Sequence, residues 1–170
     1  PGALGGDDYA AVSGVTGIQD PAGRRQGRKM GETAGLTLTY GAQPRRLTTG
    51  SNINDLDPAK RQAALASLKE GIDEAYERGA KGFAFLSGKY EEATLEQSYA
   101  ALKDSPAQLC DHAASMGDMP VLLEVFDYDF DKKSLIGPAP PARRFADDMT
   151  CRHHTFGRMV QTSPIVQRHQ

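Results

Sequence analysis

The chain has 170 residues, enough for one domain with a sizeable buried core. Its 39% hydrophobic and 25% charged residues are typical of a soluble globular protein, and a net charge of −2 argues against a basic surface for nucleic acid or an acidic membrane. No apolar run reaches the roughly 18 residues that a membrane-spanning helix needs, and no signal peptide is visible. We therefore expect a cytoplasmic protein with no nucleic-acid and no membrane partner.

The first third of the chain alternates between strand and helix patterns. A strand is predicted at 9–18, followed by a short helix over 21–35. A second, β-rich strand is predicted at 36–44, where Pro44 ends it. This order is the beginning of a βαβ unit.

The middle of the chain holds the clearest helix. Asp57 is a good N-cap, apolar residues follow at three- and four-residue spacing, and Gly79 is a suitable C-terminal cap. A third strand follows at 81–89. The next helix, over 94–116, contains Pro106, which predicts a kink or a division into two short helices.

A fourth strand at 119–126, a short helix at 141–150 and a fifth strand at 156–166 complete the pattern. Alternating strands and helices predict an α/β fold with a parallel sheet, either a doubly wound sandwich or a (β/α) barrel. The folded part is expected to span 9–166. The ends at 1–8 and 167–170 are expected to be a disordered or trimmed segment and a tail.

Polar side chains stand where the predicted strands end. Glu124 ends an apolar run, so its buried charge requires a metal, a cation or a salt bridge. Tyr40 and Gln43 end the second strand, and Ser87 and Lys89 end the third. Because the carboxyl ends of parallel strands meet at one edge, these residues are candidates for binding substrate hydroxyls or a phosphate. The alternative for Ser87 to Lys89 is a tight turn.

Several other polar residues are assigned structural roles. Asn52 and Asn54 are expected to be turn and cap residues rather than ligands. His153 and His154 are adjacent, a spacing that rarely lets two side chains bind one ion, so a surface loop is expected there.

The strand ends also carry a resemblance to a known family. The chain resembles the xylose isomerase-like TIM-barrel family of sugar-phosphate isomerases and epimerases, over roughly residues 9–164. The resemblance is carried by an ordered series of stretches: "TYGAQP" (39–44), "NINDLDPAKR" (52–61), "EGIDEAYERGAKGFAFLSGK" (70–89), "LLEVFDYDFDKKSLIGP" (122–138) and "FGRMVQTSP" (156–164).

Membership would imply a (β/α)₈ barrel, a sugar or sugar-phosphate substrate, and a divalent metal such as Mn²⁺ or Mg²⁺, with Zn²⁺ or Co²⁺ as alternatives. It would also imply a pair of glutamates that move a proton on a sugar carbon. Glu124 matches the first of these and would be both catalytic residue and metal ligand. Gln161 occupies the position of the family's metal-binding Asp, and Pro164 that of a His.

A complete TIM barrel takes about 250 residues, whereas this chain holds about five βα units, so the expected fold is a partial barrel. Three functions stay open: an isomerase or epimerase, a non-catalytic remnant that associates with itself as a homo-oligomer, and a metal-dependent hydrolase of the same superfamily. Gln is a poorer ligand than Asp for a hard cation, and this favours the second interpretation for the chain as written.

Overall fold

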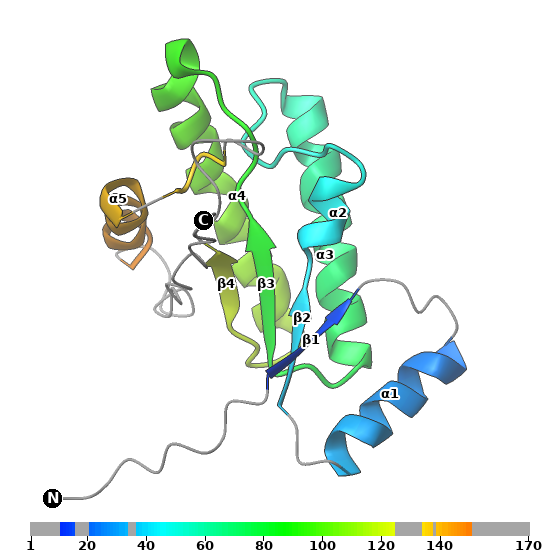
Figure 1. Cartoon of the computed structure of the whole chain (residues 1–170). Coiled ribbons are helices and arrows are strands. Elements are labelled where there is room, and N and C mark those ends of the chain that lie inside the picture. Colours follow the sequence, from blue (N-terminus) through cyan, green and yellow to red (C-terminus); the bar gives the residue numbers. More distant parts are fainter. Residues whose placement is uncertain (1–10, 16–20, 34–36, 125–133, 138, 151–170) are drawn as a thin grey trace, which may run out of the picture.

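A computed structural model describes residues 11–15, 21–33, 37–124, 134–137 and 139–150 (Figure 1). Four strands form one parallel sheet: β1 (Ala11–Val15), β2 (Thr37–Gly41), β3 (Gly82–Leu86) and β4 (Val121–Glu124). The helices are α1 (Pro21–Thr33), α2 (Gln43–Leu47), α3 (Pro58–Glu77), α4 (Leu95–Met116) and α5 (Ala139–Thr150), with a 3₁₀ turn, η1 (Glu92–Thr94), before α4.

The order of the strands distinguishes between the two candidate architectures. The sheet runs β1-β2-β3-β4, so each strand pairs with its neighbour in sequence. A doubly wound sheet reverses its order at a switch point, whereas a barrel adds each new strand on the same side. The described sheet is therefore an arc of a (β/α) barrel, with α3 and α4 packed together beside it (Figure 1). The strand predicted at 156–166 lies outside the described residues.

The predicted elements that fall within the described residues are present, but several boundaries differ. β3 is shorter than the predicted 81–89, β4 begins at Val121 instead of residue 119, and the two-helix alternative at Pro106 is wrong because α4 continues through it. Pro44 does not end the second strand. That strand ends at Gly41, and Pro44 occupies the first turn of α2. The N–H groups of a first turn have no partner within the helix, so a proline, which lacks an N–H, costs no hydrogen bond there. Gln43 therefore begins a helix instead of ending a strand.

The core is built from the sheet and the helices that cover it. The rings of Tyr40, Phe83 and Phe85 stack across β2 and β3. The ring centroids of Tyr40 and Phe83 are 5.6 Å apart, and those of Phe83 and Phe85 are 6.5 Å apart. A Cβ on Gly71 would lie 3.1 Å from the Phe83 ring, so this glycine lets α3 approach β3 closely. Close packing of this kind fixes the distance between the sheet and α3.

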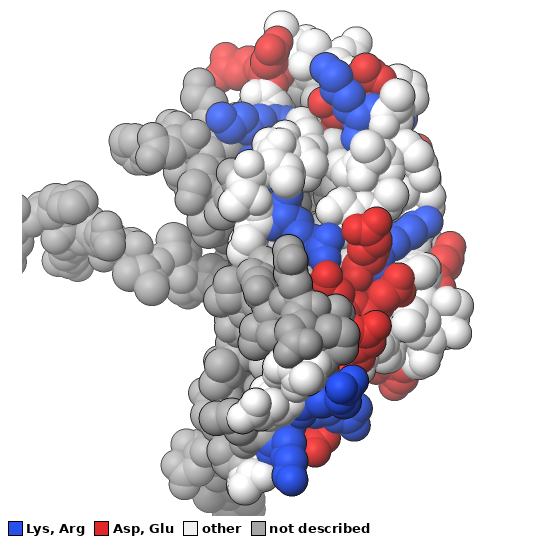
Figure 2. Space-filling view, turned by 90° about the vertical axis from the view of Figure 1, so that its right-hand side faces the viewer, with Lys and Arg blue, Asp and Glu red and all other residues white. Residues whose placement is uncertain are grey.

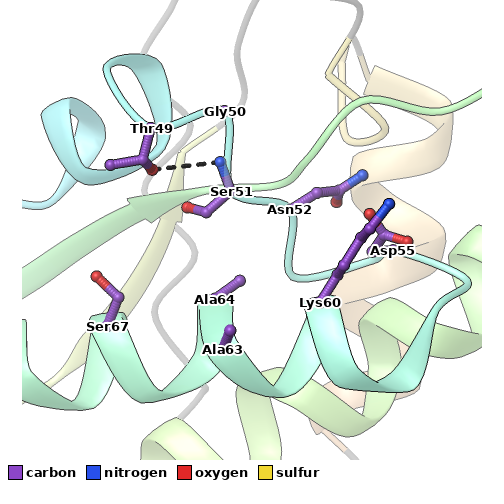
Figure 3. A pocket seen from close by; sticks show the side chains of 9 residues that line it. All are labelled: Thr49, Gly50, Ser51, Asn52, Asp55, Lys60, Ala63, Ala64 and Ser67. Atoms are coloured by element: carbon purple, nitrogen blue, oxygen red, sulfur yellow. Dashed lines mark hydrogen bonds between the residues drawn. The ribbon is translucent and has the colours of Figure 1, made fainter.

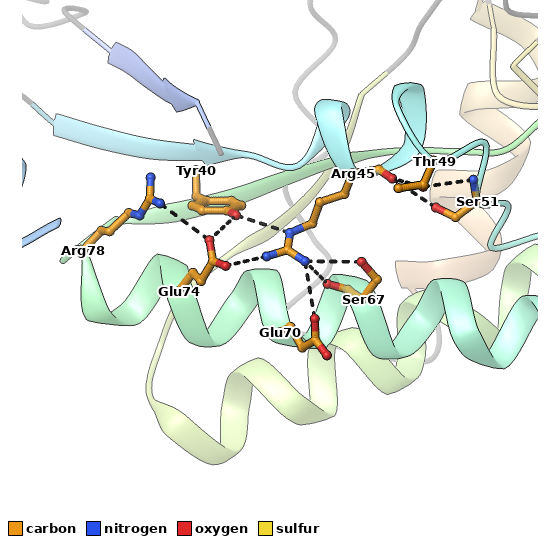
Figure 4. Close-up of polar contacts among 8 residues, drawn as sticks. All are labelled: Tyr40, Arg45, Thr49, Ser51, Ser67, Glu70, Glu74 and Arg78. Atoms are coloured by element: carbon orange, nitrogen blue, oxygen red, sulfur yellow. Dashed lines mark hydrogen bonds and ion pairs between the residues drawn. The ribbon is translucent and has the colours of Figure 1, made fainter. Parts of the chain in front are cut away.

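A polar cluster beside these rings connects β2, α2 and α3 (Figure 4). The Tyr40 hydroxyl donates to Glu74 Oε2 at 2.8 Å, and Arg45 Nη2 lies 2.7 Å from Glu74 Oε1. Arg45 also donates to the Ser67 carbonyl at 2.9 Å. Burial raises the pKa of Tyr40, so this hydroxyl stays a neutral donor to the glutamate at neutral pH.

Helix α5 is attached to α4 by ion pairs. Arg144 donates two hydrogen bonds to the carboxylate of Glu96, both at 2.9 Å, and its guanidinium lies 4.2 Å from the centre of the Tyr99 ring. Lys103 Nζ lies 3.0 Å from Asp148 Oδ2. Burial raises the pKa of Tyr99 to about 12. These contacts hold the last described helix against the helical layer.

The face that carries α1 and α3 shows basic and acidic side chains interspersed (Figure 2). The ion pairs of Arg45 in α2 with Glu70 and Glu74 in α3 contribute to this mixture. Within the described ranges, no helix is both long enough and apolar enough to cross a membrane.

The Arg45 cluster offers a matched test of what holds α3 in place. We expect Glu74→Ala to lower the free energy of unfolding by about 2 kcal/mol, because it removes the carboxylate that accepts from both Arg45 and the Tyr40 hydroxyl. Glu70 also pairs with Arg45, but at 3.6 Å and with a side chain that is 73% exposed. Glu70→Ala should therefore change the free energy of unfolding by no more than about 0.5 kcal/mol. Urea denaturation followed by circular dichroism measures both, and equal losses would contradict the assignment.

Candidate functional site

The carboxyl ends of β2, β3 and β4 lie side by side. Gly41 pairs with Ala84 across β2 and β3, and Leu86 pairs with Glu124 across β3 and β4. The register therefore brings the segments that follow these strands to one edge of the sheet, which is where barrels of this type carry their chemistry.

Glu124 is the last residue of β4 and is partly buried. Its Oε1 accepts a hydrogen bond of 2.7 Å from Nε2 of Gln43, the first residue of α2. A hydrogen bond to a charged group offsets part of the cost of removing that charge from water. The structure thus brings together two of the residues singled out in the sequence, and the partner of the carboxylate is a neutral amide.

Ser87 directly follows β3 and is fully buried. Its Oγ accepts a hydrogen bond of 3.0 Å from the Ile136 backbone N–H, and Leu135 N donates to the Gly88 carbonyl at 3.0 Å. The segment Ser134–Gly137 is therefore attached to the end of β3. Ser87 has a backbone partner here, and its expected role as a substrate ligand stays a prediction.

The turn after Ser87 is held by two asparagines. Asn54 Nδ2 and Asn52 Nδ2 both donate to the Lys89 carbonyl, at 2.8 and 3.0 Å. Asn54 Oδ1 accepts from the Gly88 N–H, and Asn52 Oδ1 accepts from Asn54 N. The Lys89 backbone is therefore fixed while its side chain is exposed. The predicted turn role of the asparagines is confirmed, and it extends to the neighbouring loop.

Asn54 is the residue whose importance the sequence did not indicate. It is fully buried, although asparagine in a loop is normally exposed. An N-x-N pattern is common in turns and does not by itself distinguish Asn54. The role of Asn54 follows from its partners, Gly88 and Lys89, which lie 34 and 35 residues further along the chain.

Tyr40 is not brought to this edge. Its ring lies between the sheet and α3, and its hydroxyl is bonded to Glu74 and Arg45 (Figure 4). Side chains alternate between the two faces of a strand, so a strand-end residue can point toward the helices as easily as toward the barrel mouth. The hypothesis that Tyr40 contacts substrate finds no support in this geometry.

The described residues do not by themselves fit a divalent metal. They contain no group of three or more His, Cys, Asp or Glu side chains that could hold an ion. Glu124 has one neutral amide beside it, whereas Mn²⁺ and Mg²⁺ prefer several oxygen ligands, most of them carboxylates. Gln161 lies outside the described residues, so its expected ligand role is not tested.

The family model described as xylose isomerase-like TIM barrel matches residues 8–147. The chain belongs to this family. The match covers the four described strands and α1 to α4, and it confirms both the resemblance stated from the sequence and the partial-barrel fold.

Several of the solved structures that share the fold are sugar epimerases. D-psicose 3-epimerase from Clostridium cellulolyticum H10, with D-tagatose, aligns over 81% of this chain and 47% of its own, at 16% identity and a TM-score of 0.64. L-ribulose 3-epimerase aligns over 82% and 45%, at 16% identity and a TM-score of 0.62. 3-Keto-D-glucoside 4-epimerase from E. coli aligns over 78% and 52%, at 18% identity and a TM-score of 0.57.

The chain spans about half the length of these structures. At such low identities the likeness shows a shared fold. No curated protein sequence matches the chain significantly.

Two glycines at opposite ends of β3 provide a matched test of the asparagine-held turn. A Cβ on Gly88 would lie 1.6 Å from Asn52 Oδ1, so Gly88→Ala must displace the amide and should cost about 2 kcal/mol of stability or more. A Cβ on Gly82 would meet Thr39 at an ordinary 3.6 Å, so Gly82→Ala should stay within about 1 kcal/mol of the parent. Urea unfolding of both variants measures the difference, and a tolerated Gly88→Ala would refute the close approach.

Proposed function

We propose that this chain contributes the proton-transferring carboxylate of a sugar or sugar-phosphate isomerase or epimerase. The observation that carries the proposal is Glu124 at the end of β4, with one oxygen bonded to Gln43 at 2.7 Å. The family and the epimerases that share its fold support this class of reaction.

The geometry suits general acid–base chemistry. Gln43 fixes Glu124 Oε1, and among the described residues it is the only hydrogen-bond partner of this carboxylate. Oε2 can then take a proton from a carbon next to a carbonyl. Returning the proton to the other face of that carbon gives an epimer, and returning it to the neighbouring carbon gives the aldose or ketose isomer. Gln43 acts as a positioning residue, because it holds the base without supplying or removing a proton.

A second group must supply or take the other proton for either reaction to be complete. The described residues near Glu124 do not include another carboxylate bonded to the same pair. The relatives are about twice as long as the aligned part, so the second glutamate implied by the family would lie beyond it. Glu124 can exchange the proton on the sugar carbon by itself, whereas the complete isomerisation or epimerisation is proposed for a whole barrel to which this chain contributes.

Lys89 is the proposed contact for a phosphate or hydroxyl group of the substrate. Its side chain is exposed, and its backbone is fixed beside the end of β3. A lysine held in this way can attract an anion as a point charge. The family implies a metal, but the donors of the described residues do not by themselves fit one.

The non-catalytic interpretation rests on a separate observation. Among the described strands, β1 and β4 each have one neighbour, so each presents an edge to which another strand can pair. Self-association of a partial barrel into a homo-oligomer therefore stays a candidate. The hydrolase alternative is supported by no cluster of metal ligands in the described part of the chain. A cytoplasmic location stays a prediction.

The proposal is tested by solvent deuterium exchange. The purified chain is incubated in D₂O with D-fructose or D-tagatose, with and without Mn²⁺, and deuterium on the sugar carbons is followed by NMR. We expect incorporation, reduced about 100-fold or more by Glu124→Gln, since general acid–base catalysis is worth about that much. Gln43→Leu should reduce deuterium incorporation about tenfold, because Glu124 is still present as a base but is no longer held in its orientation.

The control is Glu91→Gln, an exposed glutamate whose side chain caps nothing in η1. It should leave the exchange unchanged. Circular dichroism confirms that each variant is folded. A folded parent chain that incorporates no deuterium, or one in which Glu124→Gln is as active as the parent, would reject the proposed function for this polypeptide.

A further inference from the structure

A cavity of about 400 Å³ lies between the segment that follows α2 and the amino-terminal half of α3 (Figure 3). Its walls come from residues 49–52 and Asp55 on one side and, on the other, from four residues of α3: Lys60, Ala63, Ala64 and Ser67. Gln43 and Glu124 do not line it. The cavity is therefore separate from the carboxylate pair proposed for catalysis.

The hydroxyl groups in the wall have defined orientations. Thr49 Oγ1 and Ser51 Oγ both donate to the Arg45 carbonyl. Thr49 Oγ1 also accepts from the Ser51 N–H at 3.3 Å, so Ser51 Oγ is the oxygen that supplies an acceptor to the cavity. Ser67 Oγ accepts from Arg45 Nη1 at 3.3 Å, so its own proton can be donated. Arg45 thus sets the direction of three hydroxyls, and the wall offers both acceptors and donors.

The charges in the wall balance. Lys60 contributes an ammonium group and Asp55 a carboxylate, and both side chains are drawn reaching toward the space above α3 (Figure 3). One oxygen of Asp55 accepts from the Asp57 N–H at 2.9 Å and the other can accept from a ligand. A carboxylate in the wall disfavours a phosphate or another anion, and the ammonium disfavours a cation. An uncharged ligand fits this pair best.

The floor of the cavity is small and apolar. Ala63 and Ala64 of α3 lie beneath the polar rim, and Gly50 adds no side chain to the opposite wall. Methyl groups beneath a ring of polar groups suit a molecule with C–H bonds on one face and hydroxyls around its edge.

From these features we infer that the cavity between α2 and α3 is a binding site for an uncharged polyhydroxylated molecule of monosaccharide size. Each hydroxyl of such a ligand both donates and accepts, which matches a wall that offers Ser51 and Asp55 as acceptors and Ser67 and Lys60 as donors. The volume lies within the usual range for small-molecule pockets, about 300–1,000 Å³. The inference does not depend on the proposed catalytic role of Glu124.

The probe for this site is methyl α-D-glucopyranoside. Its ring is locked and has no free carbonyl, so it cannot undergo the proposed reaction at Glu124. We expect saturable binding to the full chain in the millimolar range, measured by chemical-shift changes of backbone amides in 59–67 during an NMR titration. Ala63 is exposed, so Ala63→Phe can fill the cavity without entering the core, and it should weaken binding at least tenfold.

The matched control is Ala66→Phe, an exposed alanine of the same helix that does not line the cavity. It should leave the affinity within twofold of the parent, as should Glu124→Gln. Lys60→Met, which keeps the side-chain stem but removes the donor, should weaken binding severalfold and guards against a folding defect in Ala63→Phe. The inference is overturned by no binding, by binding that Ala63→Phe does not weaken, by loss in Glu124→Gln, or by inorganic phosphate binding more tightly than the glycoside.

Discussion

Three side-chain amides from the segment that follows β2 hold the ends of the next two strands. Gln43 bonds to Glu124 at the end of β4, and Asn52 and Asn54 bond to the turn at Gly88 and Lys89 after β3. A carboxamide is neutral and offers both a donor and an acceptor, so it can satisfy a backbone N–H, a carbonyl or a carboxylate without burying another charge. The geometry of the strand ends depends on these bonds.

The outer layer places those amides. Arg45 lies two residues after Gln43 in α2, and its guanidinium is attached to α3 through Glu74 and the Ser67 carbonyl (Figure 4). Because α2 is only five residues long, it has little stability of its own and takes its position from this attachment. Glu74 also accepts from the Tyr40 hydroxyl, so the same ionic cluster ties α2 to β2 and α3. Residues that face the helices thereby set the orientation of residues that face the barrel mouth.

Arg45 also connects the two sites that we propose. On one side its helix presents Gln43 to Glu124, and on the other its carbonyl orients the hydroxyls of Thr49 and Ser51 in the cavity wall. Asn52 belongs to both regions, since it lines the cavity and bonds to the Lys89 carbonyl. The polar groups of residues 43–55 thus form three hydrogen-bonded groups, around Gln43, Arg45 and the two asparagines, and the backbone of this short segment joins them.

The sequence by itself determined the alternation of strands and helices, the long helix that starts at Asp57, and the position of Glu124 at a strand end. These features are local: they follow from apolar periodicity and from capping residues, which act over a few positions. The sequence also carried the resemblance to the xylose isomerase-like family. It did not reveal that Pro44 lies in the first turn of a helix, that Tyr40 faces α3, or that Asn54 is buried. Only the tertiary structure decided these, because the partners of Tyr40, Gln43 and Asn54 lie 34 to 81 residues away along the chain. A hydrogen bond over such a separation depends on how the sheet and α3 pack together, and no local pattern of residues encodes that packing.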